Sequence, residues 1–421
     1  MKITHINTAD TGGAFVACAR LHKGLLQQNI DSNLLTLYKN TNKLFAHEAF
    51  KRYDYPTLQR IYQKIKRISI ESQEKKIKKG KLPQYEGVGV IKSEYKIEMH
   101  SLVKSADILH LHWVNGLLDY PSFFTQNKKP IVWTLHDLSP ITGGCHYAWD
   151  CEKFTNNCNN CPQLPIKLQS PKDVSYQNFL QKKKLFENQK IHIIGNSEWT
   201  TKQAQKSNLL ENVTSFQTIP LALDTKTFRP HQKDICRDLL GIPDGYIVVG
   251  FSAVFIDELR KGLNYLLEAI LFLAEKHKIC CLSFGAGNYH FTPHHNLFQC
   301  NLGKIESEEL QAIAYSAADI FVIPSLQESF GQTALEALAC ATPVIGSNVG
   351  GIPDMVLDNQ TGYLVPPADS RALANAIEKL ILDENKRLEL GRNARFFVEE
   401  KFNLALQAQR YIALYQKIMN Q

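Results

Sequence analysis

The chain has 421 residues, of which 44% are hydrophobic and 21% are charged, the balance of a globular protein with ample core. At roughly 150 residues per domain, this length predicts two or three domains. No stretch reaches the ~18 consecutive apolar residues of a membrane span. The start, Met1–Thr8, is typical of a strand and lacks the apolar segment of a signal peptide, so a cytoplasmic location is expected.

Strand-like and helix-like segments alternate along both halves, which predicts an α/β fold with parallel sheets and crossover helices. Strands are expected at 3–7, 32–37, 107–113, 131–135 and 191–196, then at 246–252, 280–284, 297–301, 320–324 and 343–346. Many are continuous apolar runs, as in strands covered on both faces. The clearest helices are expected at 14–28, 333–340, 371–382 and 404–419.

Gly12 and Gly13 separate the first predicted strand from the first predicted helix. A glycine pair at such a turn lets a ligand approach backbone N–H groups. A tight turn needs glycine as well, so the pattern alone leaves both interpretations open.

The net charge of +7 is concentrated between Lys51 and Lys81, where eleven Lys/Arg face three acids. Ile61, Ile65 and Ile68 share one face of a helix expected at 57–79. One interpretation is a solvated helix packed by this apolar stripe. The other is a basic amphipathic helix that rests on anionic lipid. No aromatic-interleaved basic motif accompanies the charges, so nucleic-acid binding is not expected.

Three of the histidines on or after predicted strands are candidates for the site. His136 follows strand 131–135, where the carboxyl end of a parallel strand faces the ligand site; the alternative is a structural histidine held by Asp137. His110 and His112 share one face of their strand. They are interpreted as core or site-lining residues rather than as a metal pair.

The ten cysteines fall into two groups. Six stand in apolar contexts and are expected to be reduced core residues: Cys18, Cys236, Cys280, Cys281, Cys300 and Cys340. The others have the spacing C-x5-C-x6-C-x2-C: Cys145, Cys151, Cys158 and Cys161. Four thiols this close favour a structural Zn²⁺ held by four thiolates. An iron–sulfur cluster, and reduced or disulfide-paired thiols, are the alternatives.

The break between the halves is expected in segment 219–230, where two prolines and a polar run follow a short strand. This gives an N-terminal domain 1–220, a C-terminal domain 221–402 and a terminal helical segment 403–421. After strand 246–252, Arg260 and Lys261 precede a predicted helix. A cation there can neutralise a departing diphosphate, whereas a solvated Arg-Lys pair is the alternative.

The most informative segment is 324–354. Glu328 follows strand 320–324, Gly331 permits close backbone approach, and a helix begins at Gln332 or Thr333. Its unpaired N–H groups and positive end can hold phosphate. Glu336, assigned to the first turn, is placed to bind ribose hydroxyls, and Glu328 to lie near a sugar. The pattern predicts a site for a sugar linked to a nucleoside diphosphate.

This segment resembles the E-x7-E motif of family 4 glycosyltransferases, which have the GT-B fold of two facing Rossmann-like, doubly wound domains. Glu328 and Glu336 have the motif's spacing, and the flanking Pro324-Ser325, Phe330-Gly331, Thr342-Pro343-Val344 and Gly350-Gly351-Ile352-Pro353 are also similar. The resemblance extends over most of the chain. Segment 219–228 resembles the interdomain linker, 361–365 the following strand, and the terminal helix one that crosses back to the N-terminal domain. The cysteine cluster is similar to an insertion in a polysaccharide-assembly subset of the family.

The resemblance implies roles for individual residues. Glu336 would bind the donor ribose, Glu328 the transferred sugar, and His136 would lie near the reaction centre; the catalytic set is His136, Glu328 and Lys261. The donor site would comprise Gly12, Gly13, Arg260, Lys261, Glu328, Ser329, Phe330, Gly331, Gln332, Thr333 and Glu336. An arginine that many members have shortly before the lysine is replaced here by Ile256.

The expected activity is that of a retaining hexosyltransferase. It would use a UDP- or GDP-sugar and a glycan or lipid-linked acceptor in surface polysaccharide or lipopolysaccharide synthesis, at the inner face of the membrane. Because no D-x-D occurs in the chain, no metal is expected in the chemistry. A sugar-nucleotide 2-epimerase on the same fold and a non-catalytic sugar-nucleotide-binding protein are the alternatives.

Overall fold

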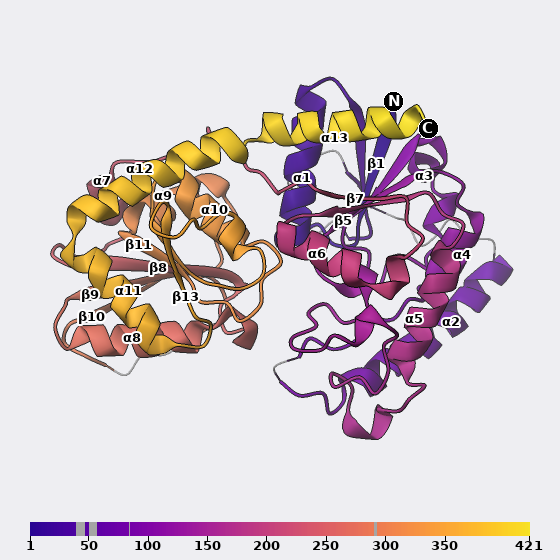
Figure 1. The fold of residues 1–421 in the computed structure, drawn as a ribbon, viewed down its shortest axis with the longest axis horizontal. Coiled ribbons are helices and arrows are strands. Elements are labelled where there is room, and N and C mark those ends of the chain that lie inside the picture. The colour runs from indigo at the N-terminus through magenta and orange to yellow at the C-terminus, as the bar shows by residue number, and fades with distance from the viewer. Residues whose placement is uncertain (39–46, 50–56, 84, 290–292) are drawn as a thin grey trace. The chain divides into compact units, whose positions relative to one another are not determined.

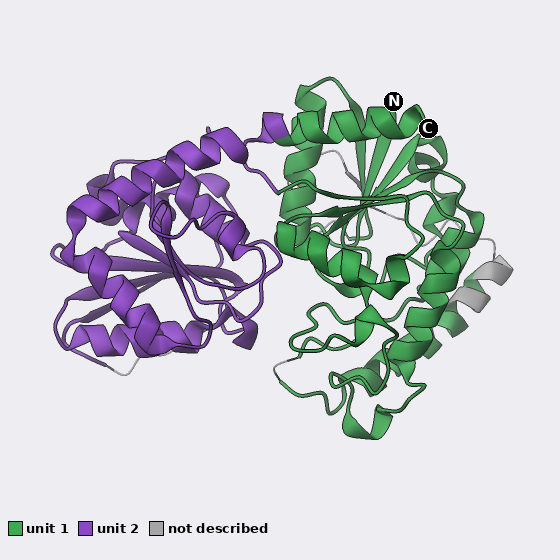
Figure 2. Ribbon diagram, viewed as in Figure 1, with its two compact units in different colours: residues 1–220, 407–421 green, residues 221–406 purple. Residues whose placement is uncertain are grey.

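The computed structural model describes residues 1–38, 47–49, 57–83, 85–289 and 293–421. These residues form two compact units (Figure 2): unit 1 comprises 1–220 with 407–421, and unit 2 comprises 221–406. The chain leaves unit 1 after Pro220 and returns to it within the last helix.

Unit 1 is built on a seven-stranded sheet in the order β3-β2-β1-β4-β5-β6-β7, with all neighbours parallel (Figure 1). The strands are β1 Lys2–Asn7, β2 Asp31–Thr36, β3 His47–Ala49, β4 Ile108–Leu111, β5 Ile131–Leu135, β6 Ile191–Gly195 and β7 Ser215–Thr218. Most strand residues are buried, since helices cover both faces.

The two faces of this sheet bury separate apolar clusters. On one face, α1 (Gly12–Gln27) and α13 (Leu404–Met419) pack over alternate strand residues such as Ile3 and Ile108. On the other, Ile6 and Leu109 pack under α3 (Ser101–Ser105), α4 (Tyr120–Gln126), α5 (Val174–Phe186) and α6 (Glu198–Lys206). The period of two along each strand sends neighbouring side chains to opposite layers.

Unit 2 repeats the plan with a six-stranded parallel sheet in the order β10-β9-β8-β11-β12-β13. Its strands are β8 Ile247–Phe255, β9 Ile279–Ala286, β10 Leu297–Asn301, β11 Ile320–Ile323, β12 Val344–Ser347 and β13 Gly362–Val365. Helices α7 (Lys233–Leu239) and α9 (Glu308–Ala317) pack on one face, and α8 (Leu263–Ala274) and α11 (Ser370–Leu382) on the other. Helices α10 (Gln332–Ala339) and α12 (Glu384–Lys401) contact each other.

The predicted doubly wound α/β fold is confirmed, and the expected strands differ from the observed ones mainly at their ends. The largest difference is 107–113, which shortens to β4. His112 N–H still donates to the Ile6 carbonyl, but Trp113 N–H donates to the Asn7 side chain at 3.0 Å and leaves the ladder. Helix α1 begins at Gly12 rather than Ala14, and α10 spans 332–339 rather than 333–340.

The basic segment forms α2 (Thr57–Lys78), but the interpretation in which its isoleucine stripe packs against the protein is wrong. Ile61, Ile65 and Ile68 are 57%, 64% and 55% exposed. The helix packs instead through Ile70 and Ile77, which lie on a different face because successive residues turn by about 100°. Of the helices in the described ranges, none combines the length and the apolar character that crossing a bilayer requires.

Candidate functional site: a buried glutamate between two cations

The sheet order of unit 2 gathers the predicted donor residues. Strand β11 lies between β8 and β12, so the loops that follow these three parallel strands meet at one edge. Glu328 comes from the loop after β11, and Arg260 and Lys261 come from the short turn Leu259–Lys261 after β8. Gly350 and Gly351 follow β12. The site is therefore assembled from three segments distant in sequence.

Glu328 is a buried carboxylate held by two cations. Lys261 Nζ lies 2.6 Å and Arg260 Nη1 3.8 Å from Glu328 Oε2, and Ser325 Oγ donates to the same oxygen at 3.4 Å. Burial raises the pKa of Glu328, but the charges of Lys261 and Arg260 outweigh it and leave that pKa below its ordinary value. The carboxylate is thus ionised at neutral pH.

Arg260 joins this cluster although it is the immediate neighbour of Lys261. Both residues belong to one tight turn, and the Arg260 side chain is buried, with Nη1 donating to the Gln327 carbonyl at 3.0 Å. Ile256, which replaces the arginine of the family pattern, is fully buried in the apolar core of unit 2. Arg260 is therefore the second cation beside Glu328.

The backbone of Glu328 is clamped by the glycine pair. Gly351 N–H donates to the Glu328 carbonyl at 3.0 Å. Gly350 has φ +55°, and a Cβ there would stand 1.7 Å from that carbonyl oxygen. This close approach gives a physical reason for Gly350 that the sequence pattern alone did not provide.

Glu336 lies in the second turn of α10, not in the first as predicted. The helix begins at Gln332, so Glu336 is its fifth residue, beyond one turn of 3.6 residues. The side chain is buried, and Tyr315 donates a hydrogen bond to Oε2 at 2.8 Å. Sequence reasoning missed Tyr315, because no motif marks a tyrosine of α9 as a partner of α10.

The remaining donor residues surround the start of α10. Gly331, the residue before the helix, has φ +101°, a conformation that glycine adopts without strain. Ser329 and Phe330 are buried, whereas Gln332 and Thr333 are half-buried. The structure thus places Arg260, Lys261, Glu328 to Thr333, and Glu336 around one loop and helix start of unit 2.

The other predicted site residues, Gly12, Gly13 and His136, belong to unit 1. Gly12 has φ +85°, and a Cβ there would meet no atom within 4 Å. The positive φ at position 12, rather than a lack of space for a side chain, therefore favours glycine there. His136 follows β5 directly.

His136 ends a line of hydrogen-bonded imidazoles. His112 Nδ1 lies 3.0 Å from His136 Nε2, and His112 Nε2 lies 3.0 Å from His5 Nδ1. The three rings meet because β4 lies between β1 and β5. Burial lowers the pKa of His136 to about 4, so its ring is neutral at physiological pH.

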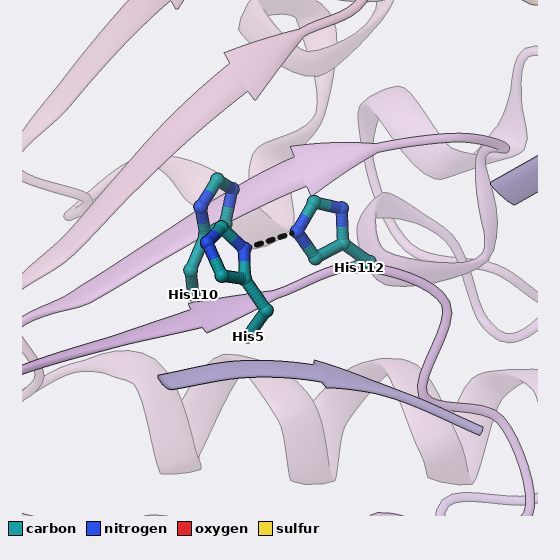
Figure 3. A group of neighbouring side chains, drawn as sticks. All are labelled: His5, His110 and His112. Carbon is teal, nitrogen blue, oxygen red and sulfur yellow. Dashed lines mark hydrogen bonds between the residues drawn. The ribbon is translucent and has the colours of Figure 1, made fainter. Parts of the chain in front are cut away.

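His5, His110 and His112 have ring nitrogens within 4.8 Å of one another, the spacing of a metal site (Figure 3). Five of the six ring nitrogens are already hydrogen bonded, including His110 to Tyr415 OH at 2.6 Å and to Thr134 Oγ1 at 2.8 Å. Burial lowers the pKa of each ring. These bonds support the interpretation as core histidines.

Asp137 binds other partners next to His136. Its carboxylate accepts hydrogen bonds from Trp113 Nε1 at 2.9 Å and from Ser139 N–H at 2.8 Å, and it pairs with His146 Nδ1 at 2.6 Å. Burial lowers the pKa of His146, but the Asp137 charge outweighs it and raises that pKa. Asp137 thereby ties the His136 loop to the cysteine-rich segment.

Comparisons with known proteins identify similar glycosyltransferases. Residues 232–396 match the family model "Glycosyl transferases group 1". The D-inositol 3-phosphate glycosyltransferase of Corynebacterium jeikeium (strain K411) is 32% identical over 222 residues, 48% of this chain and 52% of that protein. The capsular polysaccharide biosynthesis glycosyltransferase CapM of Staphylococcus aureus is 44% identical over 89 residues, 21% and 23% of the two chains. The chain spans about half the length of the curated relatives it matches.

A solved structure extends the likeness to the whole chain. Anabaena Alr3699/HepE, solved with UDP and glucose, superimposes with a TM-score of 0.67 at 17% identity and covers 99% of this chain and 100% of its own. At this identity the likeness shows the fold. Residues 232–396 are thus similar to the group 1 glycosyltransferases, and the whole chain has the GT-B fold.

Proposed function

We propose that the protein is a retaining glycosyltransferase that moves a hexose from a nucleoside-diphosphate sugar to a glycan or lipid-linked acceptor in surface polysaccharide or lipopolysaccharide synthesis. The observation that carries this proposal is the buried Glu328 carboxylate, paired with Lys261 and Arg260 directly before α10. The family match over 232–396 includes all three residues.

In this proposal the start of α10 binds the donor. Backbone N–H groups of Phe330, Gly331 and Gln332 hold the diphosphate, because the first N–H groups of a helix have no partner within it. Glu336 accepts hydrogen bonds from the ribose hydroxyls, with its carboxylate oriented by Tyr315. Glu328 contacts the transferred sugar.

The charge that develops on the leaving diphosphate needs nearby cations. Lys261 supplies one and Arg260 lies beside it, so we propose that these two residues and the helix start replace a divalent metal. Attack by the acceptor on the face that the diphosphate leaves would retain the anomeric configuration, with a phosphate oxygen taking the proton. A neutral His136 would hydrogen-bond the sugar or the acceptor.

A thermal-shift panel of UDP, GDP, ADP and their hexose conjugates tests donor binding. A ligand at about 100 times its dissociation constant should stabilise its site by roughly 2.7 kcal/mol. UDP-glucose is tested first, because HepE was solved with UDP and glucose. Glu336→Gln should reduce the shift, whereas Glu389→Gln, a half-exposed carboxylate of α12, should leave it unchanged.

Turnover tests the chemistry separately. Glu328→Gln is expected to lower sugar transfer by about 100-fold while the nucleotide still raises the melting temperature. Full transfer after replacement of both glutamates would contradict the proposal. Donor epimerised without an acceptor would instead identify a 2-epimerase, and nucleotide binding without any product would identify a binding protein.

We further propose that α2 rests on an anionic membrane surface, which would bring the enzyme to a lipid-linked acceptor. The exposed Ile61, Ile65 and Ile68 stand on the helix side away from the packed Ile70 and Ile77. Exposed lysines flank the same side: Lys64, Lys75, Lys76 and Lys79. Apolar side chains bordered by lysines suit the interface of an anionic bilayer.

Flotation with phosphatidylglycerol vesicles tests this surface. Binding should occur at low salt and weaken as salt rises, and phosphatidylcholine vesicles should bind little. Ile65→Asn should weaken binding by about tenfold, since burying one isoleucine contributes about 1.5 kcal/mol or more. Ile235→Asn is the matched control, because Ile235 of α7 in unit 2 is also exposed, at 53%. No binding at low salt would exclude the membrane role.

A further inference from the structure

Four cysteines of unit 1 share one pocket. Cys145, Cys151, Cys158 and Cys161 lie in the connection between β5 and α5 and line a single pocket together with apolar side chains such as Val88 and Phe154. All four are free thiols, and three of them are buried. From this cluster we propose that the four cysteines bind one Zn²⁺ as a structural tetrathiolate centre. The proposal does not depend on the transfer chemistry.

A backbone donor already points at one of the sulfurs. Gly143 N–H donates to Cys158 Sγ at 3.1 Å. A Cβ on Gly143 would stand 2.4 Å from the Ser175 carbonyl oxygen and 2.9 Å from Cys158 Cβ, so glycine is needed for this approach. Burial raises the pKa of Cys158, and the hydrogen bond from Gly143 opposes that shift.

A buried cation lies beside the same sulfurs. Lys182 of α5 is 1% exposed, and its Nζ donates to the carbonyls of Ser139 and Thr142. Within the described part of the chain, no carboxylate is at ion-pair distance from it. Burial lowers the pKa of Lys182 to about 8, while Cys158, Cys145 and the Asp137 carboxylate act in the opposite direction. Zn²⁺ with four thiolates carries a net charge of −2, so a filled site would add to the compensation of the buried Lys182 charge that Asp137 already provides.

Zinc would have to draw the sulfurs together. Among the described residues, only His5, His110 and His112 form a group whose ligand atoms lie within 4.8 Å of one another. A Zn–S bond of about 2.3 Å therefore requires the cysteine loop to contract around the ion. The loop between Cys151 and Cys158 is partly exposed, and the proposal requires this loop to move toward the ion.

A zinc ion bound by the four cysteines would stabilise two parts of unit 1. Cys161 packs with Ile77 of α2, Val88 and Leu164 in one apolar cluster. Next to Cys145, His146 pairs with Asp137 of the loop that carries His136. A zinc ion would thus stabilise both the base of α2 and the His136 loop without joining the reaction.

Metal content of the full-length protein, purified without chelators, tests the proposal. Elemental analysis should find one zinc per chain. Exchange for Co²⁺ should produce the intense visible bands of a tetrahedral thiolate site, and removal of the metal with a chelator should lower the melting temperature of unit 1. Cys158→Ser and Cys161→Ser should each lose the metal.

Cys300→Ser is the matched control. Cys300 is a buried thiol of β10 in unit 2 that donates to the Leu240 carbonyl at 3.7 Å, so this variant should keep one zinc. If a cysteine variant fails to fold, cobalt exchange in the wild-type protein still decides the question. A metal-free wild type that gives no cobalt spectrum, disulfides within the cluster, or bound iron with sulfide would each overturn the proposal.

Discussion

Glu328 shows how one side chain can be buried and remain charged. The desolvation cost is offset because Lys261, Arg260 and Ser325 all approach one carboxylate oxygen. A carboxylate held in this way is already oriented before a ligand arrives. It is also the residue whose titration should be visible in the stability of unit 2.

Glu328→Gln should destabilise unit 2 by about 2 kcal/mol at neutral pH, because it removes charge-assisted hydrogen bonds. The folded-state pKa of Glu328 lies below the ordinary value of 4.5. This stabilisation is therefore complete above about pH 4.5 and is lost as the pH falls through the folded-state pKa. Melting curves of both proteins should differ by a constant amount above pH 5 and converge in more acidic solution.

Glu389→Gln is the control for this titration, because Glu389 pairs with Lys386 while half-exposed. Its effect should stay within about 0.5 kcal/mol at every pH. A Glu328→Gln protein that melts like the wild type at pH 7 would show that the carboxylate contributes no net stability.

At the scale of elements, the loops after β8, β11 and β12 act together because these strands are neighbours in the sheet. The helix start at α10 supplies backbone donors, and the other two loops supply the cations and the glycine clamp. A Cβ on Gly350 would make the shortest contact in this assembly, 1.7 Å from the Glu328 carbonyl oxygen.

Gly350→Ala should destabilise the site by far more than the free-energy cost of backbone strain alone. Positive φ at a non-glycine residue costs about 1–2 kcal/mol, and here the new Cβ would also overlap the Glu328 carbonyl. We expect loss of the nucleotide-induced thermal shift and at least tenfold lower transfer, with the unfolding of unit 1 unchanged.

Gly241→Ala is the control that separates backbone strain from steric overlap. Gly241 also has a positive φ, +65°, but a Cβ there would meet no atom within 4 Å. It should lose only the strain energy and keep nucleotide binding. Equal effects of the two substitutions would mean that contact with Glu328 is not what requires Gly350.

At the scale of the whole molecule, the end of the chain completes the core of its first unit. Tyr411 and Tyr415 of α13 are fully buried against the unit 1 sheet, and Tyr415 OH bonds His110 at 2.6 Å. Residues 407–421 therefore belong to unit 1 although unit 2 precedes them in sequence.

Tyr415→Ala should destabilise unit 1 by about 3–5 kcal/mol, the usual cost of deleting a buried aromatic ring. At ~2–4 °C per kcal/mol for a unit of this size, its calorimetric transition should fall by about 10 °C. The unit 2 transition, identified by its response to nucleotide, should not move. Met419→Ala, a 47% exposed position on the same helix, should leave both transitions unchanged.

The sequence by itself determined what depends on neighbours in the chain. Apolar runs predicted most strands, and the local order strand, loop, glycine and helix marked Glu328, Gly331 and the start of α10. The spacing of the cysteines marked a cluster. These features are readable because their residues lie within a few turns of one another along the backbone.

The tertiary structure decided which of these segments meet. Strand order placed Arg260 and Lys261 beside Glu328, 67 and more positions away in sequence, and it aligned His5, His112 and His136. Helix α2 packs against unit 1 through the face that carries Ile70, and Ile61, Ile65 and Ile68 remain exposed. Such outcomes depend on non-local contacts between sheet neighbours and on which apolar face finds a partner, and neither is encoded in a local pattern.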